Sequence, residues 1–531
     1  MAQEHRPLGA QISHMLKERG VDVIFGIPGV HNQEMYRGIE EAGITHVLAR
    51  HEQGAGFMAD GYARATGKPG VAYVITGPGL CNIMTPMGQA YSDSVPMLVI
   101  SSCLDEVAAT RGQLHQMKDQ RAAAETVCDW SEEARTPQAA YALINRAFAQ
   151  MQTQRPRPKH IQVPIAALQA QAAPHDATDM GPPVGQMQAD GQQLAEVAKL
   201  IGQARRPLLV LGGGASEAAS EIRSLLARCP MPVFTSYAGR GIVGPDFPWL
   251  FGSALARPDS ASVFESADLV ITVGSELAEV DLWRPQLGHR AAMVRVDIDA
   301  EVLAAQAGTT LRLQARAKSF FAGLLAVDNL PSAFDWVLED VSKARARWHA
   351  QTDAERPGIV PICDALRAVV PADTMIYSDM TQFAYVAKEV WDMDRPGHWH
   401  HPYGFGTLGY ATPAAIGGAV ARRGKPTMAI IGDYGFHYTC QELGVAVELG
   451  LSLPIILWDN GKLKEIEDSM VRAQIAPNAV VARNPDFVKL AEAFGAQAVA
   501  PGSLADLQSA VTQAFAAQGP TLIYLTPDIA G

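Results

Sequence analysis

Two polar side chains in the last third of the chain are placed so that they can hold a metal ion together. Asp433 directly follows an apolar run at residues 427–431, and Asn460 closely follows a second run at residues 454–458. Apolar runs of this length are typical of buried parallel strands, and a helical pattern lies between them. Both strands of such a unit end at the same edge of the sheet, so we expect Asp433 and Asn460 to converge there.

A carboxylate oxygen and an amide oxygen are hard ligands, which suit Mg²⁺ or Ca²⁺. Mg²⁺ usually keeps few protein ligands, and phosphate oxygens complete its octahedron. Gly432 precedes the carboxylate, and Gly435 lies at the start of the predicted helix, where backbone N–H groups can bind phosphate oxygens. The pattern therefore predicts a metal-bound diphosphate. The alternative is a strand-end aspartate in an ordinary Rossmann-like unit.

The stretch that carries these ligands resembles the metal–diphosphate motif of thiamine diphosphate-dependent enzymes, the superfamily of pyruvate decarboxylase and acetolactate synthase. The resemblance implies that Asp433 and Asn460 bind Mg²⁺ and that Lys462 lends it a backbone carbonyl oxygen. Tyr434 and Asp459 depart from the superfamily pattern of Gly-Asp-Gly followed by Asn-Asn. The ligands survive both departures, but Tyr434 changes the packing around the diphosphate and places the chain in a separate subfamily.

Glu52 is the candidate catalytic residue of the first third of the chain. It follows a short predicted strand and opens a predicted helix, where a carboxylate can simply favour the helix dipole by about 0.3–1 kcal/mol. Residues 50–64, however, resemble the catalytic glutamate segment of the superfamily. The resemblance implies that Glu52 bonds N1′ of the cofactor's aminopyrimidine ring, so that the 4′ nitrogen can remove the C2 proton. That task requires a poorly solvated carboxylate.

Further parts of this first third resemble segments that contact the cofactor in the superfamily. His115 falls on a loop where relatives place a substrate-facing His or Gln, and a solvated loop histidine is the alternative. Residues 76–82 resemble the TGPG-x-x-N turn, and residues 88–91 resemble the helix on the pyrimidine side. The resemblance assigns cofactor binding to Pro28, Gly29, Thr76, Asn82 and Gln89.

The last third adds residues that shape the cofactor site. Residues 404–410 are similar to the GTMG-F segment of acetolactate synthases. The resemblance implies that Leu408 holds the cofactor in its bent V shape, and that the carbonyl of Gly406 accepts a hydrogen bond from the 4′-amino group. Gln382 lies just beyond the first predicted strand, at residues 374–379, and we expect it above the crevice as a catalytic and cofactor-binding residue.

A charged run follows Asn460. The resemblance implies that this stretch lines the substrate pocket and that Leu463 binds the cofactor. A charge run is most often a solvated helix face, which is the favoured alternative here. Glu465 or Glu467 could otherwise meet a cationic tail of the substrate.

The length of 531 residues suggests three domains of roughly 150 residues. The motifs and the resemblance predict three doubly wound α/β domains with parallel sheets. These are a pyrimidine-binding domain at residues 1–170, a Rossmann-like middle domain at 190–327 and a diphosphate-binding domain at 355–531.

The middle domain lacks a complete nucleotide-binding motif. Gly212, Gly213 and Gly214 follow a predicted strand, but Glu217 stands where G-x-G-x-x-G needs its last glycine. The superfamily's middle domain holds FAD in some members and nothing in others. We favour an empty site and leave FAD open. An NAD-dependent oxidoreductase that uses this domain is a further alternative to a thiamine diphosphate-dependent enzyme.

Composition excludes several other functions. A hydrophobic content of 48% with 18% charged residues is typical of a compact enzyme. The net charge of −12 argues against nucleic acid as a partner. No signal peptide and no apolar run near the ~20 residues needed to span a bilayer is visible, so we predict a cytoplasmic protein without a membrane partner. The six cysteines show no metal-binding spacing.

The resemblance spans essentially the whole chain and implies thiamine diphosphate and Mg²⁺ as cofactors. It implies decarboxylation of a 2-oxo acid through a C2 ylide and an enamine, which is either protonated to an aldehyde or joined to a second carbonyl compound as in acetolactate synthase. It also implies that Glu52 and Asp433 come from different subunits of a homodimer or homotetramer. The local sequence looks nearer to 2-oxo acid decarboxylases of amino-acid catabolism, such as the 5-guanidino-2-oxopentanoate decarboxylase type, than to biosynthetic acetolactate synthase. A non-catalytic relative is the remaining alternative.

Overall fold

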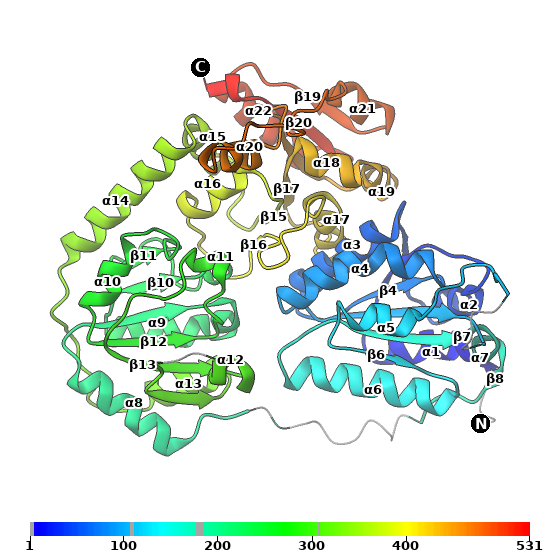
Figure 1. Cartoon of the computed structure of the whole chain (residues 1–531), viewed down its shortest axis with the longest axis horizontal. Coiled ribbons are helices and arrows are strands. Elements are labelled where there is room, and N and C mark those ends of the chain that lie inside the picture. Colours follow the sequence, from blue (N-terminus) through cyan, green and yellow to red (C-terminus); the bar gives the residue numbers. More distant parts are fainter. Residues whose placement is uncertain (1–4, 107–110, 177–184, 186, 306–307, 531) are drawn as a thin grey trace. The chain divides into compact units, whose positions relative to one another are not determined.

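The computed structural model describes residues 5–106, 111–176, 185, 187–305 and 308–530. The chain divides into two compact units. Unit 1 comprises residues 1–184, 374–381 and 401–526, and unit 2 comprises residues 185–373, 382–400 and 527–531. Three six-stranded sheets form the framework of the described residues (Figure 1).

The first sheet has the strand order β3-β2-β4-β5-β7-β6, and its paired strands are parallel. Successive residues face opposite sides, so Phe25 packs with α3 and α4 while Ile24 packs with α1 and α6. Figure 1 shows these helix pairs on opposite faces of the sheet. The elements are α1 Leu8–Glu18, β2 Val23–Gly26, α2 Gln33–Glu41, β3 Thr45–Leu48, α3 Glu52–Thr66, β4 Gly70–Val74, α4 Pro78–Ser92, β5 Met97–Cys103, α5 Gln120–Glu125, β6 Trp130–Glu133, α6 Pro137–Thr153, β7 Lys159–Pro164 and α7 Ile165–Gln169.

A second sheet of this kind is built from the last third of the chain, in the order β16-β15-β17-β18-β20-β19. Its central strands are buried on both faces, which explains their continuous apolar sequences. The elements are β15 Met375–Ser378, α16 Gln382–Val390, β16 Trp399–His400, α17 Ala411–Ala421, β17 Thr427–Gly432, α18 Asp433–Thr439, α19 Leu443–Glu448, β18 Pro454–Trp458, α20 Lys464–Arg472, α21 Phe487–Ala493, β19 Gln497–Val499, α22 Leu504–Ala516 and β20 Thr521–Leu525.

Close packing of α3 against α17 joins the two sheets within unit 1. A Cβ on Gly61 would lie 1.9 Å from the carbonyl oxygen of Ala414, and a Cβ on Gly417 would lie 1.9 Å from that of Met58. Only glycine permits backbones to approach this closely. One hydrophobic core therefore runs through both parts of unit 1.

Unit 2 holds the third sheet, in the order β11-β10-β9-β12-β13-β14. Two cores cover its opposite faces, one with α9 and α13 and the other with α10 and α14. The elements are α8 Gly191–Gln203, β9 Pro207–Leu211, α9 Ala219–Arg228, β10 Val233–Thr235, β11 Leu250–Gly252, α10 Ser260–Ser266, β12 Leu269–Val273, α11 Glu279–Leu282, β13 Ala292–Asp297, α12 Ala300–Ala305, β14 Leu311–Gln314, α13 Ala317–Leu325, α14 Leu338–Glu355 and α15 Ile359–Arg367.

The three parallel sheets confirm the predicted α/β fold class. A small antiparallel pair, β1 Arg6–Pro7 with β8 Gln171–Ala172, was not predicted. Nowhere in the described parts of the chain does a helix have the length and apolarity to cross a membrane. The predicted domain limits stay predictions.

Candidate active site

Glu52 is the first residue of α3 and is only 8% exposed. The preceding His51 caps the helix, because its Nδ1 accepts a hydrogen bond from the N–H of Gln53 at 3.1 Å. The Oε2 atom of Glu52 accepts a hydrogen bond from the side-chain amide of Asn82 at 2.9 Å. This buried carboxylate with a single amide donor has the surroundings that its predicted catalytic role requires.

The turn after β4 passes directly beside this carboxylate. Gly77 has a φ of +68°, a left-handed conformation that favours glycine. A Cβ on Gly79 would lie 3.4 Å from Oε1 of Glu52. Thr76 is anchored to the next strand, because its N–H and its hydroxyl donate to Oγ of Ser102 at 3.0 and 2.9 Å. The structure thus brings the predicted cofactor-binding turn and the predicted catalytic carboxylate together.

His115 lies in the loop after β5 and packs onto the same turn. Its backbone φ is +63°, and its carbonyl oxygen would lie 2.2 Å from a Cβ on Gly77. Gln120 holds the turn from the other side, since its Oε1 accepts a hydrogen bond from the N–H of Gly77 at 2.8 Å. The segment from His115 to Gln120 therefore packs beside the turn. Whether His115 contacts substrate stays a prediction.

The other predicted residues of this half surround the turn or lie in α4. Pro28 is exposed in the loop after β2, and the N–H of Gly29 donates to Oδ1 of Asn32 at 2.8 Å. Gln89 is fully buried, and neither polar atom of its amide finds a partner among the described residues. An unpaired buried amide costs about 1–3 kcal/mol. Gln89 therefore fits a site in which a ligand or partner surface supplies polar groups.

Sequence analysis missed Glu442, which lies between α18 and α19 and is fully buried. Its carboxylate oxygens accept hydrogen bonds from the backbone N–H of Arg50 at 3.2 and 3.0 Å. A Cβ on Gly54 would lie 2.3 Å from its Oε1 atom, so glycine is required there. Glu442 therefore fixes the turn that carries Glu52, and no local sequence pattern around it predicts this contact.

Glu442 gives the protein a predicted pH dependence of stability. Burial raises the pKa of Glu442 from 4.5 to about 7, although the N–H groups of Arg50 and His51 favour the charged form. Between these pH values the folded chain binds more protons than the unfolded chain, so the stability contributed by this group falls as pH rises. We expect the melting temperature of Glu442→Gln to decline less than that of the wild type across this window.

Thermal unfolding at a series of pH values measures this difference. The matched control is Glu448→Gln, which removes only the exposed partner of Arg50. Such surface pairs contribute about 0–1 kcal/mol. Parallel curves for the wild type and Glu442→Gln would show that Glu442 is charged in the folded protein throughout, contrary to the expectation.

Asp433 and Asn460 lie at the carboxyl ends of β17 and β18, as the sequence predicts. The strands are parallel neighbours with Gly432 opposite Trp458, so both polar side chains lie at one edge of the sheet. Asp433 is only 4% exposed. The Oδ1 of Asn460 accepts a hydrogen bond from the N–H of Lys462 at 3.2 Å. The expected strand geometry is present, and metal binding stays a prediction.

Two further side chains, the carboxylate of Asp459 and the amide of Asn484, lie beside Asp433 at this edge, and the sequence did not predict their contacts. The side-chain amide of Asn484 donates to Oδ2 of Asp433 at 2.8 Å and to Oδ1 of Asp459 at 2.9 Å. Asp459 also accepts a hydrogen bond from the hydroxyl of Tyr524 at 2.9 Å. Burial raises the pKa of Asp433, the Asn484 amide lowers it, and the nearby Asp459 carboxylate raises it again. Two carboxylates held this close together favour a cation.

The donor set suits Mg²⁺ that also binds a diphosphate. Among the residues with described positions, no group of three or more His, Cys, Asp or Glu side chains could hold a metal ion unaided. A hard ion at Asp433 therefore needs other oxygen ligands, which the amide of Asn460, the carbonyl of Lys462 and diphosphate oxygens can provide. The residues present fit this arrangement.

Asp379 lies next to the start of α18, where the diphosphate is predicted to bind. It follows β15 and is fully buried, which raises its pKa to about 6. Its carboxylate accepts hydrogen bonds from the N–H of Met380 at 2.7 Å and of Ala411 at 3.3 Å. A Cβ on Gly435 would lie 3.0 Å from its Oδ2. Asp379 therefore ties the start of α18 to the start of α17.

The remaining predicted residues fall in both units. Gly406 has a φ of +67° and precedes the half-buried Leu408 in the loop before α17. Tyr434 is half-buried in α18, and Leu463 caps α20. Gln382 is the first residue of α16 and belongs to unit 2.

The charged run after Asn460 forms helix α20, whose residues are half-buried or exposed. Glu467 pairs with Nζ of Lys462 at 3.1 Å and with Nζ of Lys464 at 3.5 Å. Two lysines therefore already compensate the Glu467 carboxylate. This contact favours the solvated-face interpretation of the run over direct recognition of a cationic substrate by Glu467.

In unit 2 the glycine turn after β9 is filled by protein. A Cβ on Gly212 would lie 2.0 Å from the carbonyl oxygen of Gly274, and Glu217 pairs with Arg316 at 3.0 Å. These contacts show that the turn packs on the neighbouring strand end. They leave FAD binding a question for experiment.

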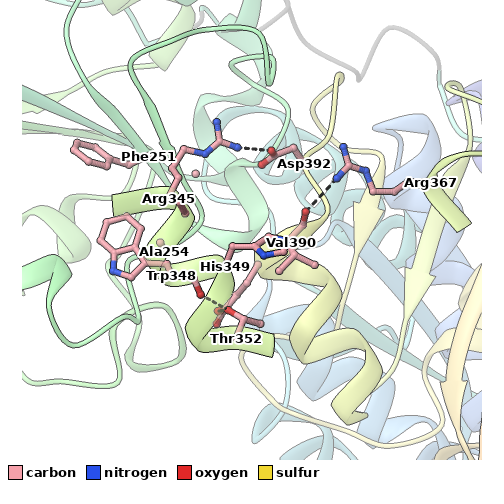
Figure 2. Close-up of a pocket in the computed structure, with 12 residues that line it drawn as sticks. Phe251, Ala254, Arg345, Trp348, His349, Thr352, Arg367, Val390 and Asp392 are labelled. Carbon is pink, nitrogen blue, oxygen red and sulfur yellow. Dashed lines mark hydrogen bonds and ion pairs between the residues drawn. The ribbon is translucent and has the colours of Figure 1, made fainter. Parts of the chain in front are cut away.

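A cavity of about 300 Å³ lies elsewhere in unit 2, beside α14 (Figure 2). Its two arginines point toward protein acceptors in this view. Arg345 pairs with Asp392 at 2.5 Å, and Arg367 donates to the carbonyl oxygen of Val390 at 3.4 Å. The positive charges in this cavity are therefore engaged within the protein.

Comparison with known families identifies the class of protein. The thiamine pyrophosphate enzyme N-terminal TPP binding domain matches residues 6–123, the central domain matches residues 194–324, and the C-terminal TPP binding domain matches residues 379–525. The chain belongs to the thiamine pyrophosphate enzymes. This result confirms the family that the sequence motifs predicted.

Individual relatives narrow the comparison. The probable 2-ketoarginine decarboxylase AruI of Pseudomonas aeruginosa is 40% identical over 97% of this chain and 93% of its own length. The acetolactate synthase isozyme 1 large subunit of Escherichia coli is 27% identical over 97% and 93%. The acetolactate synthase of Mycobacterium bovis is 29% identical over 92% and 82%. The chain is thus similar both to a probable 2-ketoarginine decarboxylase and to acetolactate synthases.

Proposed function

We propose that this protein is a thiamine diphosphate- and Mg²⁺-dependent decarboxylase that removes CO₂ from a 2-oxo acid and releases an aldehyde. The main support is its 40% identity to a probable 2-ketoarginine decarboxylase, against 27% and 29% to two acetolactate synthases. The proposed substrate is 2-ketoarginine, which is 5-guanidino-2-oxopentanoate. Carboligation of the acetolactate synthase kind is the alternative.

The site residues divide the work between the two halves of unit 1. Thiamine diphosphate, when bound, supplies the carbon nucleophile that attacks the keto group and accepts electrons as CO₂ leaves. In this proposal Glu52 holds a proton at its carboxylate toward the aminopyrimidine ring, and Asn82 orients that carboxylate. Asp433, Asn460 and the carbonyl of Lys462 bind the Mg²⁺ that anchors the diphosphate.

Product analysis with a panel of 2-oxo acids tests this proposal. With Mg²⁺ and thiamine diphosphate, we expect 5-guanidino-2-oxopentanoate to give CO₂ and 4-guanidinobutanal, with kcat/KM at least about tenfold above pyruvate. A hydrogen bond to a charged group contributes about 1.5–3 kcal/mol, which corresponds to that preference or more. Preference for pyruvate with acetolactate as the product would instead establish the carboligase. Nicotinamide absorbance changes during turnover would indicate an oxidoreductase.

We also propose that the chain works as a homodimer or as a homotetramer of such dimers. In this proposal, which follows the family resemblance, the cofactor would lie between the first domain of one chain and the third domain of another. Both halves of unit 1 expose large apolar side chains, which a partner chain could cover. They include Val30 at 58%, Leu114 at 61%, Phe405 at 49%, Tyr438 at 51% and Val481 at 69% exposure. Light scattering of the gel-filtered protein tests this, and an active monomer would contradict it.

A further inference from the structure

A buried ionic cluster lies between α3, α4 and the segment 403–410 that leads into α17. Arg64 lies in the last turn of α3, and its side chain is only 11% exposed. Its Nε donates to Oδ1 of Asp60 at 2.6 Å, and its Nη2 donates to Oδ2 of Asp93 at 2.9 Å. Both carboxylates are buried. We call these three side chains the Arg64 clamp.

The two carboxylates of the clamp hold opposite ends of the segment 403–410. Oδ1 of Asp93 accepts a hydrogen bond from the N–H of Gly404 at 2.9 Å, and its Oδ2 accepts one from the N–H of Tyr403 at 3.2 Å. At the other end, the hydroxyl of Tyr410 donates to Oδ1 of Asp60 at 2.8 Å. A single guanidinium group therefore ties together the anchors of both ends.

The first part of this segment also packs closely on α4. A Cβ on Gly404 would lie 2.8 Å from Cβ of Ser92, and a Cβ on Gly88 would lie 2.7 Å from Cζ of Phe405. These contacts leave little freedom in the path that the backbone takes from the clamp to residues 406–408. The family resemblance assigns cofactor contacts to those residues, so the clamp and α4 decide where they lie.

The electrostatics of the clamp indicate a role in fixing geometry. Burial lowers the pKa of Arg64, but Asp60, Tyr410 and Asp93 raise it well above its ordinary value, so the guanidinium stays charged. The guanidinium carbon also lies 5.6 Å from the centre of the Tyr410 ring. A buried ionic cluster is often no more stabilising than apolar side chains of similar volume. Its directional hydrogen bonds, in contrast, define the position of the groups that they hold.

We propose that the Arg64 clamp positions the carbonyl of Gly406 and the side chain of Leu408 against the aminopyrimidine half of the cofactor. This inference rests on the cofactor contacts proposed for those two residues. The clamp belongs to the half of unit 1 that carries Glu52, and the segment that it holds belongs to the half that carries Asp433. It acts on the ring side of the cofactor, while the ends of β17 and β18 anchor the diphosphate side.

Competition between thiamine diphosphate and oxythiamine diphosphate tests the clamp, because the analogue carries an oxygen in place of the 4′-amino group. In the presence of Mg²⁺, the wild type should prefer thiamine diphosphate by about tenfold, the size of one hydrogen bond to the Gly406 carbonyl. Asp93→Asn and Tyr410→Phe should each lose most of this preference, because each releases one end of the segment. The affinity for inorganic pyrophosphate with Mg²⁺ should stay unchanged. Isothermal titration calorimetry measures all three affinities.

Hydrogen exchange of the cofactor-free protein gives a readout that needs neither cofactor nor turnover. We expect faster exchange at residues 403–408 in Asp93→Asn, because asparagine offers one acceptor oxygen where the carboxylate offers two. Residues 459–463, at the diphosphate side, should exchange as in the wild type.

Two matched controls change similar contacts elsewhere in the first sheet and its helices. Asp129→Asn breaks the ion pair of the buried Lys159 at 2.8 Å, and Tyr141→Phe removes a hydroxyl that donates to the carbonyl oxygen of Ala173 at 2.7 Å. Both controls should keep the preference for thiamine diphosphate and the exchange rates of residues 403–408.

Several results would overturn the proposed role of the clamp. They are an unchanged preference in both clamp variants, an equal loss of affinity for thiamine diphosphate and for pyrophosphate, unchanged exchange at residues 403–408, or a wild type without any preference. If Asp93→Asn does not fold, Tyr410→Phe carries the test, because it removes a single hydroxyl. If the wild type decarboxylates no 2-oxo acid, the proposed function fails, while the affinities and the exchange rates still test the clamp.

Discussion

Glu52→Gln is expected to slow decarboxylation by about 10²- to 10⁴-fold, the range for loss of a positioned acid–base group. Glutamine keeps the size of the side chain, and its Oε1 can still accept the hydrogen bond from the amide of Asn82. Its amide cannot take up or return a proton at the aminopyrimidine ring. We therefore expect turnover to collapse while the affinity for thiamine diphosphate stays nearly unchanged. Steady-state kinetics and isothermal titration calorimetry measure the two quantities separately.

The control for Glu52→Gln is the same substitution at a glutamate outside the candidate active site. Glu125→Gln serves this purpose, because Glu125 is exposed and pairs only with Arg121 on α5. It should retain both turnover and cofactor affinity. Activity of Glu52→Gln equal to the wild type would remove Glu52 from the mechanism. A parallel loss of cofactor affinity would assign it a structural role in binding instead.

Sequence patterns were sufficient where strand order alone decides the position of a residue. Asp433 and Asn460 lie at one edge of the sheet because two apolar runs form parallel neighbours, and parallel strands end at one edge. Glu52 lies at a helix start because a strand ends just before it. The fold class followed from the same local regularities together with the family resemblance.

Contacts between distant segments could not be predicted in this way. Glu442 reaches the backbone of Arg50 only after α3 packs on α17, and nothing near Glu442 in the sequence marks that contact. Asn484 bridges Asp433 and Asp459 from a segment without regular structure. Such contacts depend on tertiary packing, for which hydrophobic periodicity carries no signal.

Asp459 departs from the superfamily motif, and its position in the fold shows the effect of this departure. In the sequence it is a single replacement of the first asparagine of the superfamily pattern. In the structure its carboxylate faces Asp433 across the amide of Asn484, which increases the negative charge at the proposed metal site. The replacement therefore changes the electrostatics of this edge while leaving in place the oxygens of Asp433 and Asn460 that are proposed to bind metal.

Asp433→Asn is expected to abolish stabilisation by Mg²⁺ and thiamine diphosphate while slightly raising the melting temperature of the cofactor-free protein. The first effect follows because the variant loses the only negatively charged oxygen ligand among the proposed metal ligands. A ligand at 100 times its Kd stabilises the folded state by about 2.7 kcal/mol, which corresponds to a shift of several degrees. The second effect follows because the substitution removes the repulsion between Asp433 and Asp459. Differential scanning fluorimetry with and without the cofactors measures both.

Two further measurements separate the loss of cofactor-dependent stabilisation from the rise in the melting temperature of the cofactor-free protein. EDTA should remove the cofactor-dependent shift from the wild type and leave the melting temperature of Asp433→Asn unchanged, since only the wild type depends on the metal. Asp486→Asn is the matched control, because asparagine still caps α21 and the Asp486 carboxylate pairs with Lys489 rather than with Asp433 or Asp459. A cofactor-dependent shift in Asp433→Asn equal to that of the wild type would show that the metal is held elsewhere. A lower melting temperature in its cofactor-free form would show that the Asp433 carboxylate stabilises this edge without any cation.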